Sequence, residues 1–398
     1  MRYIPRQIFP KFHEAMQAFP ALLLTGPRQS GKTTFLKEEI LPLGYQIHYL
    51  DDLTTRLFIK EDPLGFLQAY SPPLIFDEIQ YAPEILPLVK RRIDENRRPG
   101  QWILTGSQQF QLMQNITESL AGRIAIFSLL PFSLSESLQA AAEYSLAEWI
   151  YTGGYPEVVV IQQGAQQGLW MNSYLQTYLE RDVRNLRQVG DLNQFERFVK
   201  AIAARSSQIL NYSEISRDIG ISVPTAKQWI SVLEASQVIY LLSPYFRNFG
   251  KRLFKAPKVY MVDTGLLAAL LGYRNGMEIL NGPLAGAFFE TAIVSELLKW
   301  FANAGLKPAL YYWRTRDGQE IDLLIEIAGK LFPAEIKLTA TPTKSHLKGF
   351  ERIKAIMPDY LHEQSLLICT VEKETPLPFN TIALPWQRLP LYARNWEV

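Results

Sequence analysis

The sequence contains very little cysteine and histidine. A single cysteine, Cys369, and four histidines at positions 13, 48, 346 and 362 stand among 398 residues. One cysteine excludes an internal disulfide and any cysteine-based zinc cluster. Because the four histidines are scattered along the chain, a zinc site of another kind is not expected either.

Long hydrophobic runs and a strong charge of one sign are also missing. The apolar run at residues 19–25 is far shorter than the ~18–20 residues that a membrane span needs, and no leader pattern precedes it. We therefore expect a cytoplasmic protein without membrane contact. The net charge of +2 averages over the whole chain and does not by itself indicate a nucleic-acid partner. The length predicts two or three domains.

Residues 26–33 read GPRQSGKT and match the phosphate-loop pattern G-x-x-x-x-G-K-[ST]. An apolar strand is expected just before the loop and a helix just after it, so main-chain N–H groups and the helix N-terminus would face phosphate oxygens. Lys32 would reach the β- and γ-phosphates, and the Thr33 hydroxyl would bind Mg²⁺. The residues predicted to bind ATP are Gly26, Pro27, Arg28, Gln29, Ser30, Gly31, Lys32, Thr33 and Thr34.

Two carboxylates follow an apolar run at residues 74–76. A buried strand here would end in Asp77 and Glu78 where the sheet meets the phosphates. Asp77 is then predicted to hold Mg²⁺ through water, and Glu78 to act as the general base for the attacking water. The alternative for such a pair alone is a solvated strand end.

Two further residues are candidates for the nucleotide site. Residues 101–105 predict another strand, after which Ser107 could sense the γ-phosphate. Arg123 lies between an expected helix and an expected strand. It could supply positive charge to the transition state within the chain or across an interface, or it could form a structural salt bridge.

These parts, together with later stretches of the chain, resemble a widespread prokaryotic family of AAA-type P-loop ATPases that carry a C-terminal domain of unknown function. The resemblance spans nearly the whole chain in the family's order. It is carried by LLLTGPRQSGKTT, LIFDEIQYAPEILPLVK, ILTGSQQFQLM, SLAGRIAIFSLLPFS, GGYPEVV, YLERDV, KVYMVDTGLLAALLG, GAFFETAIVSELL and GQEIDLLIE.

The middle of the chain predicts a helix-turn-helix followed by two strands. Ser213 could cap a helix over residues 214–219, Gly220 would end it, and a second helix would begin at 222–224 and run to about Ser236. Apolar runs at 238–243 and 259–262 would form a wing. Such a module could bind DNA or serve only for packing. The basic residues predicted to contact DNA phosphates are Lys227, Arg247, Lys251, Arg252, Lys255 and Lys258.

The last third predicts a long helix and three strands separated by turns at residues 317–318 and 329–330. Asp322 falls on the second strand, and Glu335 and Lys337 share one face of the third. With Glu290 on the preceding helix, this arrangement resembles the PD-(D/E)XK nuclease superfamily. The resemblance implies that Asp322 and Glu335 bind a divalent metal and that Lys337 steadies water or phosphate. A structural ion pair is the alternative.

We therefore expect an α/β multidomain protein. Its parts would be a P-loop NTPase (AAA/ASCE-type) sheet at residues 1–140, a helical winged-helix domain at 141–275 and a restriction-endonuclease-like α/β domain at 276–398. The expected function is Mg²⁺-dependent ATP hydrolysis coupled to a half that binds DNA and has the residues to cleave it, in a chain that could form a homo-oligomer. The alternative is a nucleotide-dependent switch that signals through protein contacts.

Overall fold

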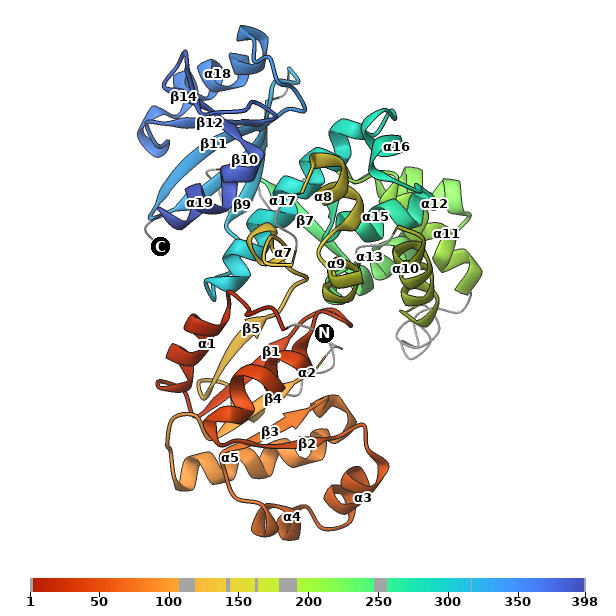
Figure 1. The fold of residues 1–398 in the computed structure, drawn as a ribbon, viewed down its shortest axis with the longest axis vertical. Coiled ribbons are helices and arrows are strands. Elements are labelled where there is room, and N and C mark those ends of the chain that lie inside the picture. The colour runs from red at the N-terminus through yellow and green to blue at the C-terminus, as the bar shows by residue number, and fades with distance from the viewer. Residues whose placement is uncertain are drawn as a thin grey trace.

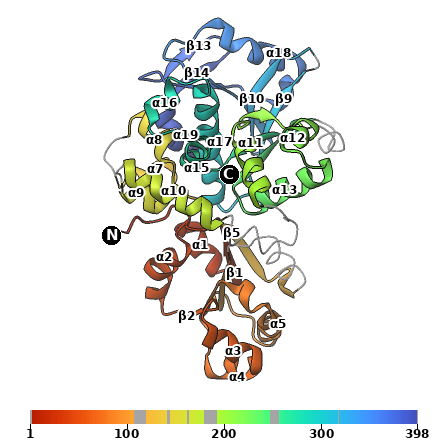
Figure 2. The same cartoon turned by 90° about the vertical axis from the view of Figure 1, so that its right-hand side faces the viewer.

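The computed structural model describes residues 3–106, 119–140, 144–161, 164–178, 192–246, 256–315 and 317–396. A parallel sheet built from the first 130 residues forms one end of the molecule, and the last strands of the chain form the other end (Figure 1). Helices of the middle segment and one long helix, α17 (Ala285–Asn303), lie between them (Figure 2).

The N-terminal sheet has five parallel strands in the order β2-β3-β4-β1-β5. Its strands are β1 (Ala21–Thr25), β2 (Gln46–Tyr49), β3 (Leu74–Asp77), β4 (Trp102–Thr105) and β5 (Ile124–Ser128). The predictions of strands β1, β3 and β4 are confirmed. Because all strands run the same way, the polar ends of β1, β3 and β4 meet at one edge.

Both faces of this sheet are covered, which explains why β1, β3 and β4 are buried along their whole length. Phe12 and Phe35 pack on one face, and Phe66 and Val89 on the other. The covering helices are α1 (Phe9–Met16), α2 (Lys32–Phe35), which continues as a π-helical turn (Leu36–Ile40), α3 (Leu53–Glu61), α4 (Pro63–Ala69) and α5 (Leu86–Glu95).

The middle segment is mainly helical. Its helices are α7 (Leu134–Ser137), α8 (Leu146–Thr152), α9 (Pro156–Ile161), α10 (Gly164–Tyr178), α11 (Leu192–Ala203), α12 (Tyr212–Ile219), α13 (Val223–Ala235), α15 (Thr264–Leu271) and α16 (Gly276–Leu280). Helices α12 and α13 meet at Gly220, whose φ of 79° suits glycine, and Ser222 caps α13. The cap of α12 is Asn211 rather than Ser213, because the helix begins two residues earlier than its sequence suggested.

A second sheet has nine strands in the order β13-β14-β12-β11-β10-β9-β7-β8-β6. Three come from the middle segment: β6 (Gln208–Ile209), β7 (Ile239–Pro244) and β8 (Lys258–Met261). The others are β9 (Leu310–Arg314), β10 (Glu320–Ile327), β11 (Lys330–Ile336), β12 (Ser365–Cys369), β13 (Thr375–Leu377) and β14 (Thr381–Pro385). The predicted hairpins β9–β10 and β10–β11 are confirmed as antiparallel pairs.

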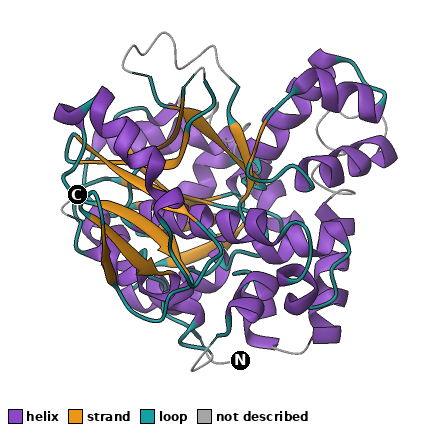
Figure 3. Cartoon of the chain, turned by 90° about the horizontal axis from the view of Figure 1, so that it is seen from above, coloured by secondary structure: helices purple, strands orange, loops and turns teal. Residues whose placement is uncertain are grey.

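Parallel pairing of β7 with β9 joins the strands of the middle segment to those of the C-terminal segment. One hydrophobic core also runs from α8 through α17 to α19 (Leu389–Arg394), while α18 (Lys348–Ile356) covers the opposite face of the C-terminal strands. Figure 3 shows the strands surrounded by helices. Among the described residues, no helix is long and apolar enough to cross a membrane.

Candidate functional site

The phosphate loop connects β1 to α2, as the sequence predicted. Gly26 has a φ of 148° and Gly31 a φ of 93°, and a Cβ on Gly26 would lie 2.3 Å from the carbonyl oxygen of Leu129. Both positions therefore require glycine. The Lys32 side chain is buried, and its Nζ donates to the carbonyl oxygens of Gly26 and Pro27 at 3.0 Å each. These bonds hold the ammonium group inside the loop.

The acidic strand end lies directly beside the loop. Thr33 Oγ1 donates to Asp77 Oδ2 at 2.9 Å, and Thr105 Oγ1 donates to the other oxygen of the same carboxylate. Burial raises the pKa of Asp77, and the hydrogen bonds from the two threonines oppose that rise. A hydroxyl and a carboxylate in contact are the oxygen donors that Mg²⁺ prefers, so this pair fits the predicted metal site.

Glu78 adopts a left-handed backbone conformation, with φ 60° and ψ 52°. Such a conformation is uncommon for a residue other than glycine and is often found at functional sites. The Thr105 hydroxyl accepts a hydrogen bond from the Glu78 main-chain nitrogen at 3.1 Å, and Gln80 donates to the Glu78 carboxylate. Thr105 thus orders both carboxylate residues, a role that the sequence reasoning did not assign to it.

Sequence reasoning also missed Arg6, which lies under the phosphate loop. Its guanidinium donates to the carbonyl oxygens of Ser30 at 2.8 Å and Leu130 at 2.6 Å, and to Glu136 Oε1 at 3.0 Å. Arg6 is 4% exposed and Glu136 is fully buried. No local motif marks Arg6 in the sequence, because its partners lie up to 130 positions away.

Hydrogen bonds continue from Glu136 to α17, because Glu136 Oε2 accepts from the Ser133 main-chain nitrogen at 2.8 Å and the next residue, Leu134, contacts α17. Both carboxylate oxygens of Glu296, on α17, accept from the main-chain nitrogen of Leu134. Burial raises the pKa of Glu296, and the neighbouring Glu136 adds to the rise, while Lys299 opposes it. The phosphate loop and α17 are therefore connected through two buried acids and one arginine.

Arg123, another candidate for the nucleotide site, is not brought to the loop. Arg123 precedes β5 and so lies at the edge of the sheet opposite the loop, where it forms two hydrogen bonds with Asp94, at 2.6 and 3.1 Å. This is the salt bridge that the sequence left open as an alternative. Ser107 lies outside the described residues.

A cavity of about 210 Å³ opens beside the phosphate loop. Three parts of the chain line it: the N-terminal segment, the start of α2 and helix α9. The lining residues include Tyr3, Ile4, Gln29, Thr34, Pro156 and Glu157. The first sheet and the helical middle segment therefore both contribute to the surroundings of the loop.

In the C-terminal sheet, Asp322, Glu335 and Lys337 lie together. Lys337 Nζ is 2.6 Å from Asp322 Oδ2 and 3.0 Å from Glu335 Oε2. The main-chain nitrogen of Ile336 also donates to Asp322 Oδ2, at 2.9 Å. The structure thus brings these three residues into contact, and both carboxylates are compensated by one ammonium group.

The fourth predicted member, Glu290, pairs with Lys258 and is close enough to Asp322 for the charge of Asp322 to raise the pKa of Glu290. Lys258 Nζ lies 3.3 Å from Glu290 Oε1 and 2.6 Å from Glu320 Oε1, and the Tyr260 hydroxyl donates to Glu290 at 2.6 Å. Lys258 was predicted to contact DNA, but it is only 5% exposed. The structure therefore places it inside the protein, between two carboxylates.

The protonation of this cluster is uneven. Burial raises the pKa of Glu335 far above its usual range, and the charge of Asp322 adds to the effect. Burial would also raise the pKa of Asp322, but Lys337 and a hydrogen bond from Glu335 bring it below its usual value. Glu335 therefore holds a proton more readily than Asp322. Among the described residues, no group of three or more His, Cys, Asp or Glu side chains is arranged to hold a metal ion.

Besides Lys258, one more residue predicted to contact DNA, Lys227, lies in the described part of the chain. Lys227 is exposed on α13, 5.7 Å from the Tyr212 ring. Arg247, Lys251, Arg252 and Lys255 lie outside the described residues.

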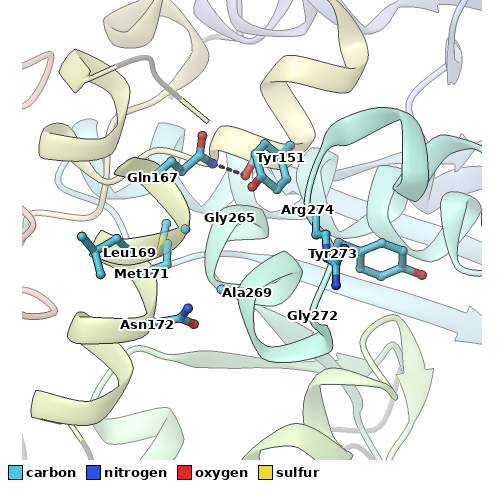
Figure 4. A pocket seen from close by; sticks show the side chains of 11 residues that line it. Tyr151, Gln167, Leu169, Met171, Asn172, Gly265, Ala269, Gly272, Tyr273 and Arg274 are labelled. Carbon is cyan, nitrogen blue, oxygen red and sulfur yellow. Dashed lines mark hydrogen bonds between the residues drawn. The ribbon is translucent and has the colours of Figure 1, made fainter. Parts of the chain in front are cut away.

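A separate cavity of about 470 Å³ lies between α10 and α15 (Figure 4). Gln167 donates to the Tyr151 carbonyl oxygen at 2.7 Å across its upper wall, and small residues, Gly265 and Ala269, form much of the α15 side. It shares no lining residue with the cavity at the phosphate loop. The predicted nucleotide site does not extend into it.

Comparison with family models divides the chain into three segments. Residues 18–138 match the model described as AAA domain, residues 143–276 match a domain of unknown function (DUF8612), and residues 285–389 match another (DUF4143). The first segment is thus similar to AAA domains. The other two descriptions assign no activity.

Similar proteins occur in bacteria and archaea. The uncharacterized proteins Mb2031c of Mycobacterium bovis and Rv2008c of Mycobacterium tuberculosis are each 29% identical over 383 residues, covering 96% of this chain and 83% of theirs. The uncharacterized protein MJ1544 of Methanocaldococcus jannaschii is 22% identical and covers 88% of this chain. Among solved structures, the Walker-type ATPase PABY2304 of Pyrococcus abyssi has a TM-score of 0.46 at 18% identity, covering 67% of this chain and 96% of that one.

Proposed function

We propose that this chain binds ATP with Mg²⁺ at the phosphate loop and hydrolyses it. The contact between Thr33 and Asp77 carries the proposal, since it brings together a hydroxyl and a carboxylate that could bind the metal, one directly and one through water. Lys32 would neutralise the β- and γ-phosphates. Mg²⁺, when bound, would offset negative charge on the transferred phosphoryl group.

Glu78 would act as the general base in this reaction. It follows Asp77 at the end of β3, and its carboxylate is oriented by Gln80. The left-handed backbone turns the residue away from the strand direction, which supports a role in positioning the attacking water.

The adenine ring would occupy the cavity beside the loop. Tyr3 and Ile4 offer apolar contacts from the N-terminal segment, and Pro156 offers one from α9. Because the lining comes from both the AAA domain and the next segment, nucleotide binding would draw the two segments together.

Loss of two side chains tests the binding site. Lys32→Ala should weaken ATP binding at least tenfold by removing the phosphate cation, and Thr33→Ala should mainly reduce the Mg²⁺ dependence of turnover. Calorimetric titration of ATP with and without Mg²⁺ separates the two effects. Wild-type affinity in Lys32→Ala would contradict the proposal.

We further propose that the nucleotide state is transmitted to a C-terminal half that binds DNA. The bonds from Ser30 through Arg6 and Glu136, and from Leu134 to Glu296, supply a continuous buried connection to α17. Glu290 lies on the same helix, beside the carboxylate cluster. A conformational change at the phosphate loop would thus be transmitted by helix α17 to the cluster of Asp322, Glu335 and Lys337.

Two candidate outputs for that half remain, and each has a supporting observation. Convergence of Asp322, Glu335 and Lys337 favours DNA cleavage with a divalent metal. Pairing of both carboxylates with Lys337 favours a retained binding fold that signals through protein contacts. No three-carboxylate metal set is found among the described residues, so a nuclease would need an oxygen ligand from substrate or water.

DNA binding and nicking assays distinguish these outputs. Filter binding at graded salt should show a steep salt slope if phosphates are contacted. Cleavage would be established by nicking that requires Mg²⁺ or Mn²⁺ and that Lys337→Ala abolishes. In the absence of ATP, Lys32→Ala should leave this nicking intact. DNA binding without nicking of single-stranded, duplex and branched substrates would exclude it, and absence of binding would favour the signalling function.

A further inference from the structure

A third cavity, of about 480 Å³, lies at the far end of the C-terminal sheet. It opens between the β10–β11 turn, the segment before β12, and α19 near the C-terminus. Its volume falls within the ~300–1,000 Å³ range of small-molecule sites. The residues that line it are Ile327, Ala328, Lys330, Phe332, His362, Gln364, Tyr392, Asn395 and Trp396.

Aromatic rings form the walls of this cavity. The His362 ring stacks on Phe332 with centroids 3.8 Å apart and planes 17° apart. Phe332 also lies 5.9 Å from Trp396, which in turn lies 6.2 Å from Tyr392. His362, Phe332 and Tyr392 are only partly buried, so part of their surface faces the cavity rather than the core. Such walls suit a planar aromatic ligand.

The polar groups at these walls are mainly hydrogen-bond donors. Trp396 Nε1 is buried and has no hydrogen-bond partner among the described residues, and an indole nitrogen can only donate. His362 Nδ1 accepts from the Gln364 main-chain nitrogen at 3.1 Å, which leaves the proton of the neutral ring on Nε2. The Tyr392 hydroxyl donates to Gln364 Oε1, so the amide NH₂ of Gln364 remains a donor.

We propose that this cavity binds a nucleobase that carries carbonyl oxygens, such as uracil, thymine or guanine. The base would lie against the aromatic walls, and its carbonyl oxygens would accept from Trp396 Nε1 and Gln364. Lys330 lines the same cavity and donates to the Asp359 carbonyl oxygen at 2.8 Å, which leaves it two further protons for a phosphate. The base belongs either to a free nucleotide or to an unpaired position in a single strand.

The inference is independent of ATP binding and is tested with full-length protein carrying Lys32→Ala, which removes the phosphate loop as a competing site. Calorimetric titrations use UMP, AMP, a thymidine oligonucleotide and an abasic strand of equal length. UMP should bind about tenfold more tightly than AMP, which lacks carbonyl oxygens. The thymidine strand should likewise bind more tightly than the abasic strand.

Two variants identify the cavity as the site. Trp396→Phe keeps an aromatic ring but removes the N–H, and should weaken UMP binding about fivefold with little effect on AMP. His362→Ala removes a stacking surface and should weaken both ligands about tenfold. Phe19→Ala, an exposed aromatic in the first domain, is the matched control and should bind like the parent.

The two sources of the base give different patterns. Similar affinity for UMP and the thymidine strand would support a free-nucleotide site, and much tighter binding of the strand would support a single-strand site. Equal binding of thymidine and abasic strands together with no UMP binding would overturn the proposal. Unchanged affinity in Trp396→Phe, a variant expected to fold, would overturn it as well.

Discussion

The phosphate loop and the Asp322 cluster both combine lysine with buried carboxylates, but they balance charge differently. Lys32 donates to two main-chain carbonyl oxygens, and its loop is shaped by glycines. Lys337 is in ion-pair contact with Asp322 and Glu335, and Lys258 with Glu290 and Glu320. The first arrangement can accept an added anion, whereas the second already compensates its charges within the protein.

This difference shows what each lysine contributes. Lys32 is hydrogen-bonded to two neutral carbonyl groups of the loop, and its charge also acts on Asp77. A ligand that approaches Lys337 or Lys258 must compete with carboxylates for the same ammonium protons. We therefore expect variants at the loop to affect turnover and variants in the cluster to affect stability.

Lys258→Ala should give the largest effect on stability. It would leave Glu290 and Glu320 without their shared cation inside the protein, and breaking a buried ion pair in this way costs about 3–5 kcal/mol. Urea denaturation measures the change. Lys227→Ala, an exposed lysine, is the control and should alter stability by no more than about 0.5 kcal/mol. Equal stability of the two variants would contradict a structural role for Lys258.

Glu78→Gln should reduce ATP turnover by about 10² or more, since it keeps the side-chain shape but removes the base. That factor corresponds to about 2.7 kcal/mol of transition-state stabilisation. ATP affinity should stay near wild type because phosphate contacts are unchanged. Steady-state turnover and nucleotide titration, performed on the same preparation, separate chemistry from binding. Wild-type turnover would exclude Glu78 as the base.

Glu335 should make stability fall as pH rises. Its pKa in the folded protein lies above its ordinary value of 4.5, so the unfolded chain loses this proton first and is favoured at higher pH. The contribution is fully present below pH 4.5 and is lost as pH rises through the raised folded value. Glu335→Gln should remove this pH dependence. Between the ordinary and the raised pKa of Glu335, the free energy of unfolding of the variant should increase relative to wild type by up to ~1.4 kcal/mol per pH unit.

Asp322 acts in the opposite direction, because its pKa in the folded protein is lowered. Asp322 contributes to stability above its ordinary pKa of 3.8, and this contribution is lost as the pH falls through its lowered pKa in the folded protein. Because the two carboxylates interact, their effects on stability must be measured together. Denaturation of wild type, Glu335→Gln and Asp322→Asn from pH 4 to 8 provides that comparison. Parallel curves for wild type and Glu335→Gln above pH 4.5 would refute the raised pKa.

Arg123→Ala should have the smallest effect. Its exposed pairing with Asp94 at the opposite sheet edge contributes little to stability, and turnover of dilute protein should be unchanged. If the chain forms a homo-oligomer in which Arg123 reaches a neighbour's nucleotide, turnover should fall only at concentrations where oligomers form. Turnover measured across a dilution series, beside light scattering, checks this prediction.

The sequence predicted those features that depend on neighbours along the chain. The loop, its flanking strand, the acidic end of β3 and the turns of the β9–β10–β11 region all follow from glycine, threonine and the alternation of apolar residues. A glycine with φ of 93° before Lys32 and a serine cap before α13 are local requirements. Local chemistry was sufficient because the backbone conformation at each of these features is set by residues close to it in the sequence.

Only the tertiary structure decided which charged groups became partners. Lys258 and Lys227 were both predicted to contact DNA, yet Lys227 is exposed while Lys258 is buried, because β8 pairs with β7 and packs beneath α17. Arg6 and Glu136 carry no motif, but they meet under the phosphate loop from positions 130 residues apart. The pairing of β7 with β9 likewise joins segments that are more than 60 residues apart. Burying an isolated charge is so costly that the fold must bring a partner to it, often from a distant part of the chain. The periodicity of one segment does not encode which residue that partner is.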